Sequence, residues 1–490
     1  MKTLHLSHIF DKWPAFYASI CFTCGLAYSS FHFLYLLSIP LILLIESFWK
    51  KRYLLSFFIL ILTYVGVHFY QKHSFNSKTV INSHGLALFQ IENISSYVSP
   101  FKTRGYIYKG TILRFETNTD TFFSIPCRFV YPNDTNKPDH TYLISGHLTK
   151  DENFYLFKPD KQKWTPSSTS KGLYYFRYLF QKKIQDYIQR NIQNVRSQNL
   201  LYALATGQLE DKELSFFFNQ LGLSHILAVS GFHFGLITFF FYFFISKCLT
   251  PKTTLYFLLF LSSIYFLMMP SSPSIQRAWI AISLSLVAQI YNLNYSALNT
   301  LGVGLLICLV TDVDYLKQPG CQLTFLATAA ILLHYSYFKQ LMNTLFPKRS
   351  ALIEHQWSFC DKCGYVIVSW FKEILSLNLA VYLLLIPTQL FIFHKFPLVS
   401  LIYNLFIPFM ISLSIFLFLS SLAFCFTPFV SSLIFKINNI WTSFTLDLVE
   451  KAPLSLSLDI SAPSFPFIYL YFYIAIFSYI GLNYIHQQQD

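Results

Sequence analysis

The residues of this sequence that could do chemistry are polar side chains set inside long apolar runs. His225, Ser230 and His233 lie in residues 222–236, which read GLSHILAVSGFHFGL and open an apolar run. Ser230 and His233 are three residues apart, so on a helix they would be neighbours, as a nucleophile and its base must be. The sequence around Ser230 lacks the G-x-S-x-G pattern of a hydrolase turn, and no H-E-x-x-H zinc motif occurs. We therefore expect these side chains to line a polar interior and not to catalyse a reaction.

A second polar group centres on Arg277, in the segment PSIQRA at 273–278. Pro273 suits the first turn of a helix and Ser272 can cap it, which places Arg277 one turn inside an apolar span. One interpretation is that the guanidinium reaches the membrane interface. The other is that it faces a pore and contacts phosphate, which matches its fork of donors. We favour the second.

A third group lies in residues 319–328, which read PGCQLTFLAT. Gln322 and Thr324 place polar groups on adjoining turns of a span. Hydrogen bonds between helices would explain them, and so would the lining of a pore. Polar and helix-breaking residues also gather in later spans, where broken backbone lines a cavity: Pro387, Gln389, Pro397, Asn404 and Pro408.

Composition identifies the class of protein. The chain has 490 residues, of which 54% are hydrophobic and only 12% are charged. Several apolar runs reach the roughly 18 residues that cross a bilayer, so we expect a polytopic α-helical membrane protein. The net charge of +13 suits anionic lipid, nucleic acid or the ordinary bias of cytoplasmic loops, and it does not choose among them.

Cofactor signals are weak in this sequence. Cys21 and Cys24, like Cys360 and Cys363, have the C-x-x-C spacing, but neither pair has a second pair nearby to complete a zinc site. We expect no metal and no cofactor. No nucleotide-binding P-loop occurs either, so energy from ATP would require a partner protein.

The expected elements fall into four regions. Residues 1–70 form an N-terminal membrane anchor of about three spans. Residues 71–171 carry short alternating strands and form a small β-barrel like the OB-fold. Residues 172–221 are a basic amphipathic helical connector, whose first part, 172–200, reads as one helix. Residues 222–490 hold about eight spans, from a first at 224–246 to others that include 374–393, and an amphipathic helix at 430–450.

Basic residues orient these regions in the membrane. The cluster at 50–52 reads KKR and lies on the cytoplasmic side by the positive-inside rule. The next span then carries the barrel to the outer side. Lys247, Lys252 and Lys339 fall in loops that this topology places inside, which agrees with an extracytoplasmic barrel.

The barrel could present a basic, aromatic face to single-stranded DNA. The alternative is a structural β-domain with an ordinary solvated face, because one fold carries many functions. The candidates for a DNA contact are Arg104, Tyr106, Lys109 and Arg114, with Tyr108 and Arg128 beside them.

Taken together, residues 222–236, 273–278 and 319–327 resemble the ComEC family of competence proteins, as does the ALATG segment at 203–207. The family is the inner-membrane channel for DNA uptake in natural transformation. The resemblance is strong over 200–450, and the barrel matches only in pattern. Phe232 and Thr324 depart mildly from the Leu and Ser usual in the family. A metallo-β-lactamase-like nuclease domain, which many members carry, has no counterpart here, because no H-x-H-x-D-H text occurs.

The resemblance implies a channel that passes one DNA strand through the helical bundle into the cytoplasm, in the cell inner membrane. Its partners would be single-stranded DNA, membrane lipids, a DNA receptor and a cytoplasmic motor protein. Assembly with further copies of this chain is left open. The residues expected to line the DNA path are His225, Ser230, His233, Arg277, Gln322 and Thr324.

Two other classes of function use the same polar interior. A membrane transporter of a lipid or small solute would need the same kind of cavity. An intramembrane hydrolase would use Ser230 and His233, and substitution of Ser230 by Ala separates it from a channel. An enzyme would lose its chemistry, whereas a channel should tolerate the small residue.

Overall fold

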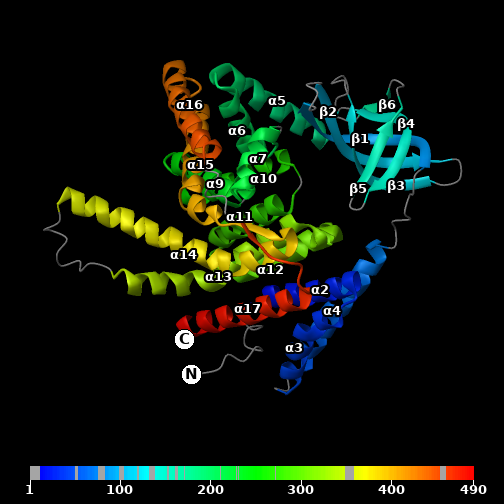
Figure 1. Ribbon diagram of the computed structural model, residues 1–490, viewed down its shortest axis with the longest axis vertical. Coiled ribbons are helices and arrows are strands. Elements are labelled where there is room, and N and C mark those ends of the chain that lie inside the picture. Colours follow the sequence, from blue (N-terminus) through cyan, green and yellow to red (C-terminus); the bar gives the residue numbers. More distant parts are fainter. Residues whose placement is uncertain are drawn as a thin grey trace.

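The structure is a helical bundle with a small β-barrel at one side (Figure 1). It is a computed structural model that describes residues 12–49, 53–74, 83–98, 104–117, 121–131, 138, 140–151, 154–160, 164–169, 172–209, 211–227, 229, 231–270, 272–347, 358–452 and 459–489. Five helices among the described residues are long and apolar enough to cross a membrane: α10 (Pro251–Met268), α13 (Pro319–Leu345), α14 (Phe359–Phe393), α15 (Val399–Ala423) and α17 (Phe467–Gln489). The expected class, a polytopic helical protein with an inserted small barrel, is confirmed.

The N-terminal anchor consists of α2 (Pro14–Phe31), the short helix η1 (Leu34–Leu37), α3 (Ser38–Trp49) and α4 (Tyr53–Ser74). Helix α2 packs against α4 and also against a later helix, α12 (Ala297–Thr311). At Gly302 of α12 a Cβ would come within 2.5 Å of the backbone of Phe16. This close approach of two backbones ties the anchor to the rest of the bundle.

The barrel follows the anchor. Its strands are β1 (Ser83–Val98), β2 (Arg104–Glu116), β3 (Thr121–Tyr131), β4 (His140–Asp151), β5 (Phe154–Pro159) and β6 (Thr165–Thr169). They pair in the order β1-β2-β3-β5-β4, and β1 pairs with β4 to close the ring. β6 adds to the outside of β4. The sequence did not indicate β6, because residues 165–169 (TPSST) have no apolar alternation and contain a proline.

An ion pair lies at one rim of the barrel. Nε2 of His84 donates to Oδ2 of Asp160 at 3.0 Å, and the ring of His147 lies 4.5 Å from that of His84. The hydrogen bond from His84 holds the pKa of the Asp160 carboxyl below its usual value. Because the folded pKa is lowered, this contribution to stability is present above the unfolded pKa and is lost as the pH falls through the folded value.

Acid should therefore loosen the barrel in part through Asp160. We expect wild-type barrel protection to fall as the pH drops below about 4, and Asp160→Asn to remove part of that dependence. The measurement is hydrogen exchange of 83–98 and 140–151 in the full chain, pulse-labelled at one common pH after equilibration at each test pH. An acid dependence identical in both proteins would contradict the assignment.

The connector and first helices after the barrel are α5 (Leu173–Asn191), α6 (Val195–Thr206), α7 (Lys212–Gln220), α8 (Ser224–Leu227) and α9 (Gly231–Ile245). They continue as α10 (Pro251–Met268), α11 (Pro273–Tyr291), α12, η2 (Val313–Lys317) and α13 (Pro319–Leu345). The last are α14 (Phe359–Phe393), α15 (Val399–Ala423), α16 (Pro428–Glu450) and α17 (Phe467–Gln489), with the two-stranded pair β7 (Lys395–Pro397) and β8 (Asp459–Ser461).

The structure corrects two expected helices. The single helix expected over 172–200 is two helices, because Ile192 is extended and the side chain of Asn194 caps α6 by accepting from the Arg196 N–H. The span expected over 224–246 is divided into α8 and α9. Such breaks are tolerated at membrane depth where the backbone is buried in protein or lines a cavity.

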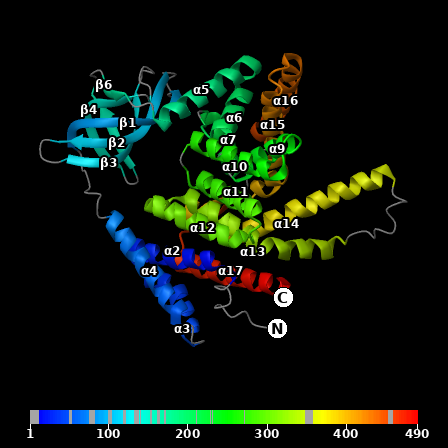
Figure 2. The ribbon, with the colours of Figure 1, turned by 180° about the vertical axis from the view of Figure 1, so that it is seen from behind.

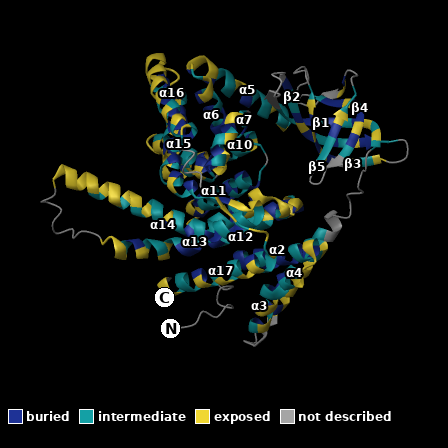
Figure 3. Ribbon diagram, viewed as in Figure 1, coloured by how far each residue is buried: buried dark blue, intermediate teal, exposed yellow. Residues whose placement is uncertain are grey.

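Helix α14 is also longer than the expected span at 374–393. It starts at Phe359, because Ser358 and Asp361 form a reciprocal capping box. Its 35 residues extend about 52 Å, against a hydrocarbon core of about 30 Å. Figure 3 shows the first part of α14 exposed on most sides, and Figures 1 and 2 place the end of the α13–α14 pair opposite the barrel.

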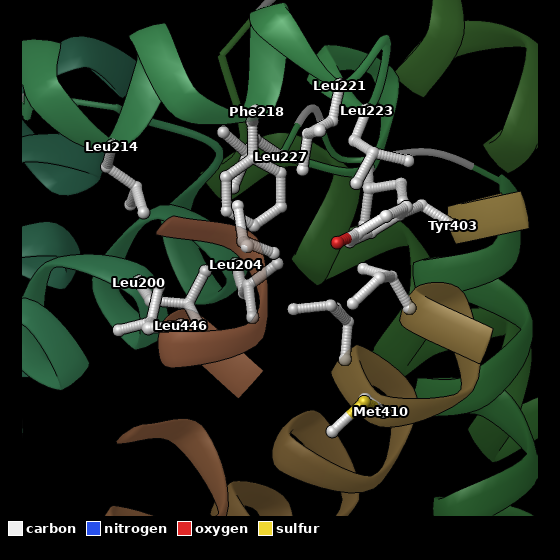
Figure 4. Close-up of a cluster of buried hydrophobic side chains, with 14 of the residues drawn as sticks. Leu200, Leu204, Leu214, Phe218, Leu221, Leu223, Leu227, Tyr403, Met410 and Leu446 are labelled. Atoms are coloured by element: carbon white, nitrogen blue, oxygen red, sulfur yellow. The ribbon is translucent and has the colours of Figure 1, made fainter. Parts of the chain in front are cut away.

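The apolar core nearest the functional residues joins α6, α7 and α8 to α15 and α16 (Figure 4). Leu204, Phe218 and Leu227 pack there with Ile407 and Leu446. The close-up shows Leu204, Phe218, Leu227 and Leu446 converging from separate helices, so the segment that carries α8 packs against the body of the bundle. This packing positions α8 and Leu223 against the bundle.

Candidate functional site

The connection from α7 to α9 has two defined ends. Gly222 adopts a positive φ of 69°, and the N–H of Leu223 reaches back to the carbonyl of Phe218 at 2.7 Å, which ends α7. At the other end, Gly231 is the first residue of α9. Between them stand the four-residue helix α8 and the buried Val229.

Arg277 lies where four helices meet. Its helix, α11, begins at Pro273, and the hydroxyl of Ser272 caps the N–H of Ile275 at 3.3 Å. Nε of Arg277 donates to Oγ1 of Thr324 in α13 at 3.1 Å. A Cβ on Gly231 of α9 would lie 3.5 Å from Nη2 of Arg277, and one on Gly304 of α12 would lie 3.9 Å from its Cγ. The guanidinium is thus held by Thr324 on one side and faces the start of α9 on the other.

The electrostatics of this position favour an anion. In the described part of the chain, no carboxylate forms a salt bridge with Arg277. The N-terminus of α9 at Gly231 adds the partial positive charge of its free N–H groups. A guanidinium and a helix N-terminus together bind phosphate well, and a charge at membrane depth otherwise needs a counter-ion.

The other expected path residues lie around this centre in different ways. Ser230 lies outside the described residues. His225 is exposed on α8, with its ring beside the main chain of Gly222. His233 is buried in α9, with 2% of its surface exposed. Gln322 is exposed on α13 and donates to the carbonyl of Leu316 at 2.8 Å, so it faces the η2 turn while Thr324 contacts Arg277.

The barrel contacts this region through the loop after α6. Nε2 of Gln208 donates to Oδ1 of Asn93 on β1 at 2.8 Å. Gly207, with a φ of 71°, lets the loop pack so closely that a Cβ there would lie 3.1 Å from Val229. A short chain of contacts therefore joins β1, this loop and the residue that precedes the break before α9.

Only some of the residues expected to form a basic face on the barrel are exposed. Lys109 is exposed and lies directly across from Arg128 of β3. Arg114 is exposed and forms a 2.5 Å salt bridge with Glu116. The inclusion of Tyr108 was wrong: it is fully buried, because residues of its parity on β2 point into the barrel.

Tyr106 also packs against the barrel core in part, and the side chain of Arg104 lies outside the described residues. An aromatic that the sequence reasoning missed is Phe123, 67% exposed and directly across from Arg114. Its place beside a basic residue follows from the β2–β3 register. Composition alone gives no such register.

The sequence reasoning also missed a polar cluster between α14 and α15. Nδ2 of Asn404 donates to the Tyr382 hydroxyl at 2.6 Å, and that hydroxyl donates to the carbonyl of Ser400 at 3.1 Å. The sequence marked Asn404 as polar in a span. Tyr382 and Ser400 gave no signal, because tyrosine and serine are common in such helices.

The fold and the site define a polytopic helical membrane protein with a closed barrel and an arginine that joins α11 to α13 through Thr324. The chain belongs to the competence protein family, whose family model matches residues 204–486. This confirms the resemblance drawn from the sequence.

Over 218 residues the chain is 25% identical to the ComE operon protein 3 of Bacillus subtilis (strain 168), a match that covers 44% of this chain. The match covers 25% of that protein, so it spans about a quarter of the relative's length. No solved structure matches the chain.

Proposed function

We propose that this protein passes single-stranded DNA through the cell inner membrane during natural transformation. Two findings support the proposal: membership of the competence family and the interior arginine site. The barrel would lie on the outer side and receive the DNA. The chain would transport the strand and catalyse no reaction on it.

The observation that carries the proposal is the environment of Arg277. The guanidinium has no carboxylate partner in the described part of the chain, and its Nη2 lies near Gly231 at the positive end of α9. A DNA strand brings a negative charge with every nucleotide, so its path must offer cationic or dipolar groups while it excludes lipid. Arg277 would supply the cationic group, and the N-terminus of α9 would supply the dipolar one.

The proposed orientation follows from the two ends of the molecule. The barrel lies at one side and the end of the α13–α14 pair at the other (Figures 1 and 2). Lys339 of α13 and Lys362 of α14 lie toward that second end, and basic residues favour the cytoplasmic side. A cytoplasmic motor protein would pull the strand from there, with a DNA receptor delivering it to the barrel.

The test is whether labelled DNA reaches the cytoplasm of cells that lack this protein. We expect DNA bound at the cell surface but little DNase-protected DNA inside, and recovery when the protein is supplied from a plasmid. Uptake unchanged by the deletion would overturn the channel and favour transport of a lipid or small solute.

A further inference from the structure

The polar cluster between α14 and α15 holds hydrogen-bonding atoms that the fold leaves unused. Oδ1 of Asn404 and Oγ of Ser400 are buried and have no hydrogen-bond partner among the described residues. Ser400 itself is 2% exposed. A buried polar atom without a partner costs about 1–3 kcal/mol, so a cluster of them calls for an occupant in the working protein.

Prolines interrupt the main-chain hydrogen bonding of both helices near this cluster. Pro408 has no N–H to give to the carbonyl of Asn404 four residues earlier, and Pro387 releases the carbonyl of Leu383 in the same way. The Leu383 carbonyl accepts from the hydroxyl of Tyr473 in α17 at 2.9 Å. The amide oxygen of Asn404 has no such partner among the described residues.

The arrangement of the cluster is fixed by Tyr382. One of the two amide N–H groups of Asn404 is committed to the Tyr382 hydroxyl, whose own proton is committed to the carbonyl of Ser400. The amide oxygen of Asn404 must then point away from Tyr382. Ser400 and Asn404 are four residues apart on α15, so their side chains share one face. The face presents the side-chain amide of Asn404 and one hydroxyl that can either donate or accept.

The polar groups of this cluster suit a nucleobase better than a phosphate or a metal ion. The cluster contains no charged side chain, and its two atoms without a partner are an amide oxygen and a hydroxyl oxygen, so it offers no positive charge to phosphate. A hard cation such as Ca²⁺ would take six to eight oxygens, with carboxylates among them. Every nucleobase, by contrast, carries at least one N–H donor and one acceptor on its pairing edge. A rotating hydroxyl beside an amide oxygen can serve all of these edges without sequence preference.

Residues 222–231 connect this neutral cluster to the arginine site. A Cβ on Gly222 would come within 2.9 Å of the Ser400 Cβ and 3.6 Å of its hydroxyl oxygen. Gly231, at the other end, faces Arg277. The same short segment therefore touches a position suited to phosphate and a position suited to bases, which are the two parts of every nucleotide.

We propose that Ser400, Asn404 and Tyr382 form a base-contacting subsite of the DNA path, distinct from the phosphate contact at Arg277. The inference rests on the proposed function, since it concerns the same strand. The main chain of Gly222 lies over Ser400, so a passing strand reaches the subsite by displacing Gly222. The free acceptors then hydrogen-bond the unpaired bases.

The test separates bases from backbone. The full-length protein in lipid nanodiscs is titrated with a fluorescent single-stranded oligonucleotide and with an abasic strand of the same length, and binding is followed by anisotropy. Wild type should bind the base-bearing strand more tightly. Asn404→Leu should weaken that binding about five- to tenfold and leave the abasic strand unaffected, because it removes the amide oxygen.

Two further variants separate loss of the base contact from misfolding. Ser400→Ala removes one hydroxyl and should weaken only the base-bearing strand, by a smaller factor. Asn438→Leu is the matched control: Asn438 is a fully buried amide of α16, bonded to the carbonyl of Ser414, and its loss should leave the preference for bases intact. Thermal unfolding in detergent verifies that each variant is folded.

The outcomes distinguish this inference from the proposed function. Arg277→Gln should weaken both strands, because both carry phosphates. If wild type binds neither strand, the proposed function fails. If wild type binds both strands while folded Asn404→Leu and Ser400→Ala keep its preference for bases, only the base-contacting subsite is overturned.

Discussion

Replacement of Arg277 by glutamine is expected to reduce the DNA that reaches the cytoplasm about 10- to 100-fold, with normal insertion into the membrane. A hydrogen bond to a charged group contributes about 1.5–3 kcal/mol, and each 1.4 kcal/mol is a factor of ten. Glutamine keeps a polar group that can still reach Thr324, so the helices should still pack. What is lost is the positive charge beside the start of α9, where a phosphate would bind.

A graded series makes this expectation sharper. Arg277→Lys keeps the charge but loses the planar fork, so its defect should be intermediate. Arg190→Gln is the control, because Arg190 is an exposed basic residue in the last turn of α5 and its loss changes the net charge equally. DNase-protected DNA is measured at matched protein levels. Normal uptake by well-expressed Arg277→Gln would remove this residue from the mechanism.

The residues of the arginine site could be predicted from the sequence, but their contact could not. Arg277 was singled out because a guanidinium is costly inside an apolar span, and Thr324 because it is polar in another span. Neither argument says that the two side chains meet. That pairing depends on how α11 packs against α13, which is a long-range contact that helical periodicity does not encode.

The breaks in helices were harder to predict for a local reason. Residues 224–246 are apolar enough to be one span, and hydropathy averages over the division into α8 and α9. The start of a new helix after Asn194 likewise depends on one side chain, because Asn194 caps α6. One capping residue in the middle of an amphipathic pattern is a weak signal against the regular spacing of the apolar residues over 172–200.

In the barrel, the sequence pattern predicts the strands but not their register. Alternation and turn residues were sufficient for a small closed barrel, which the strand order confirms. The inward side of each strand depends on its register, and a shift of one residue reverses every side chain. This is why Tyr108 was placed on the surface although it lies in the core, and why Phe123 was overlooked.

Gly222→Ala is expected to give the largest loss of stability among single substitutions in residues 222–236. At a φ of 69° an L-residue carries about 1–2 kcal/mol of strain. The new methyl would also lie 2.7 Å from the Pro397 ring and 2.9 Å from the Ser400 Cβ, and such overpacking costs typically 1–3 kcal/mol. We therefore expect a lower midpoint of chemical denaturation in mixed micelles, and loss of DNA uptake with it.

Gly235→Ala is the matched control in the same segment, and its effect should have the opposite sign. Gly235 lies within α9, and a Cβ there would meet no atom within 4 Å. Alanine in a helix interior is more stable than glycine by about 0.5–1 kcal/mol, so the denaturation midpoint should rise slightly. Equal midpoints for the two variants would contradict the tight packing of Gly222 on α15. A lower midpoint for Gly222→Ala alone would show that the left-handed backbone of Gly222 and its close packing on Ser400 stabilise the fold.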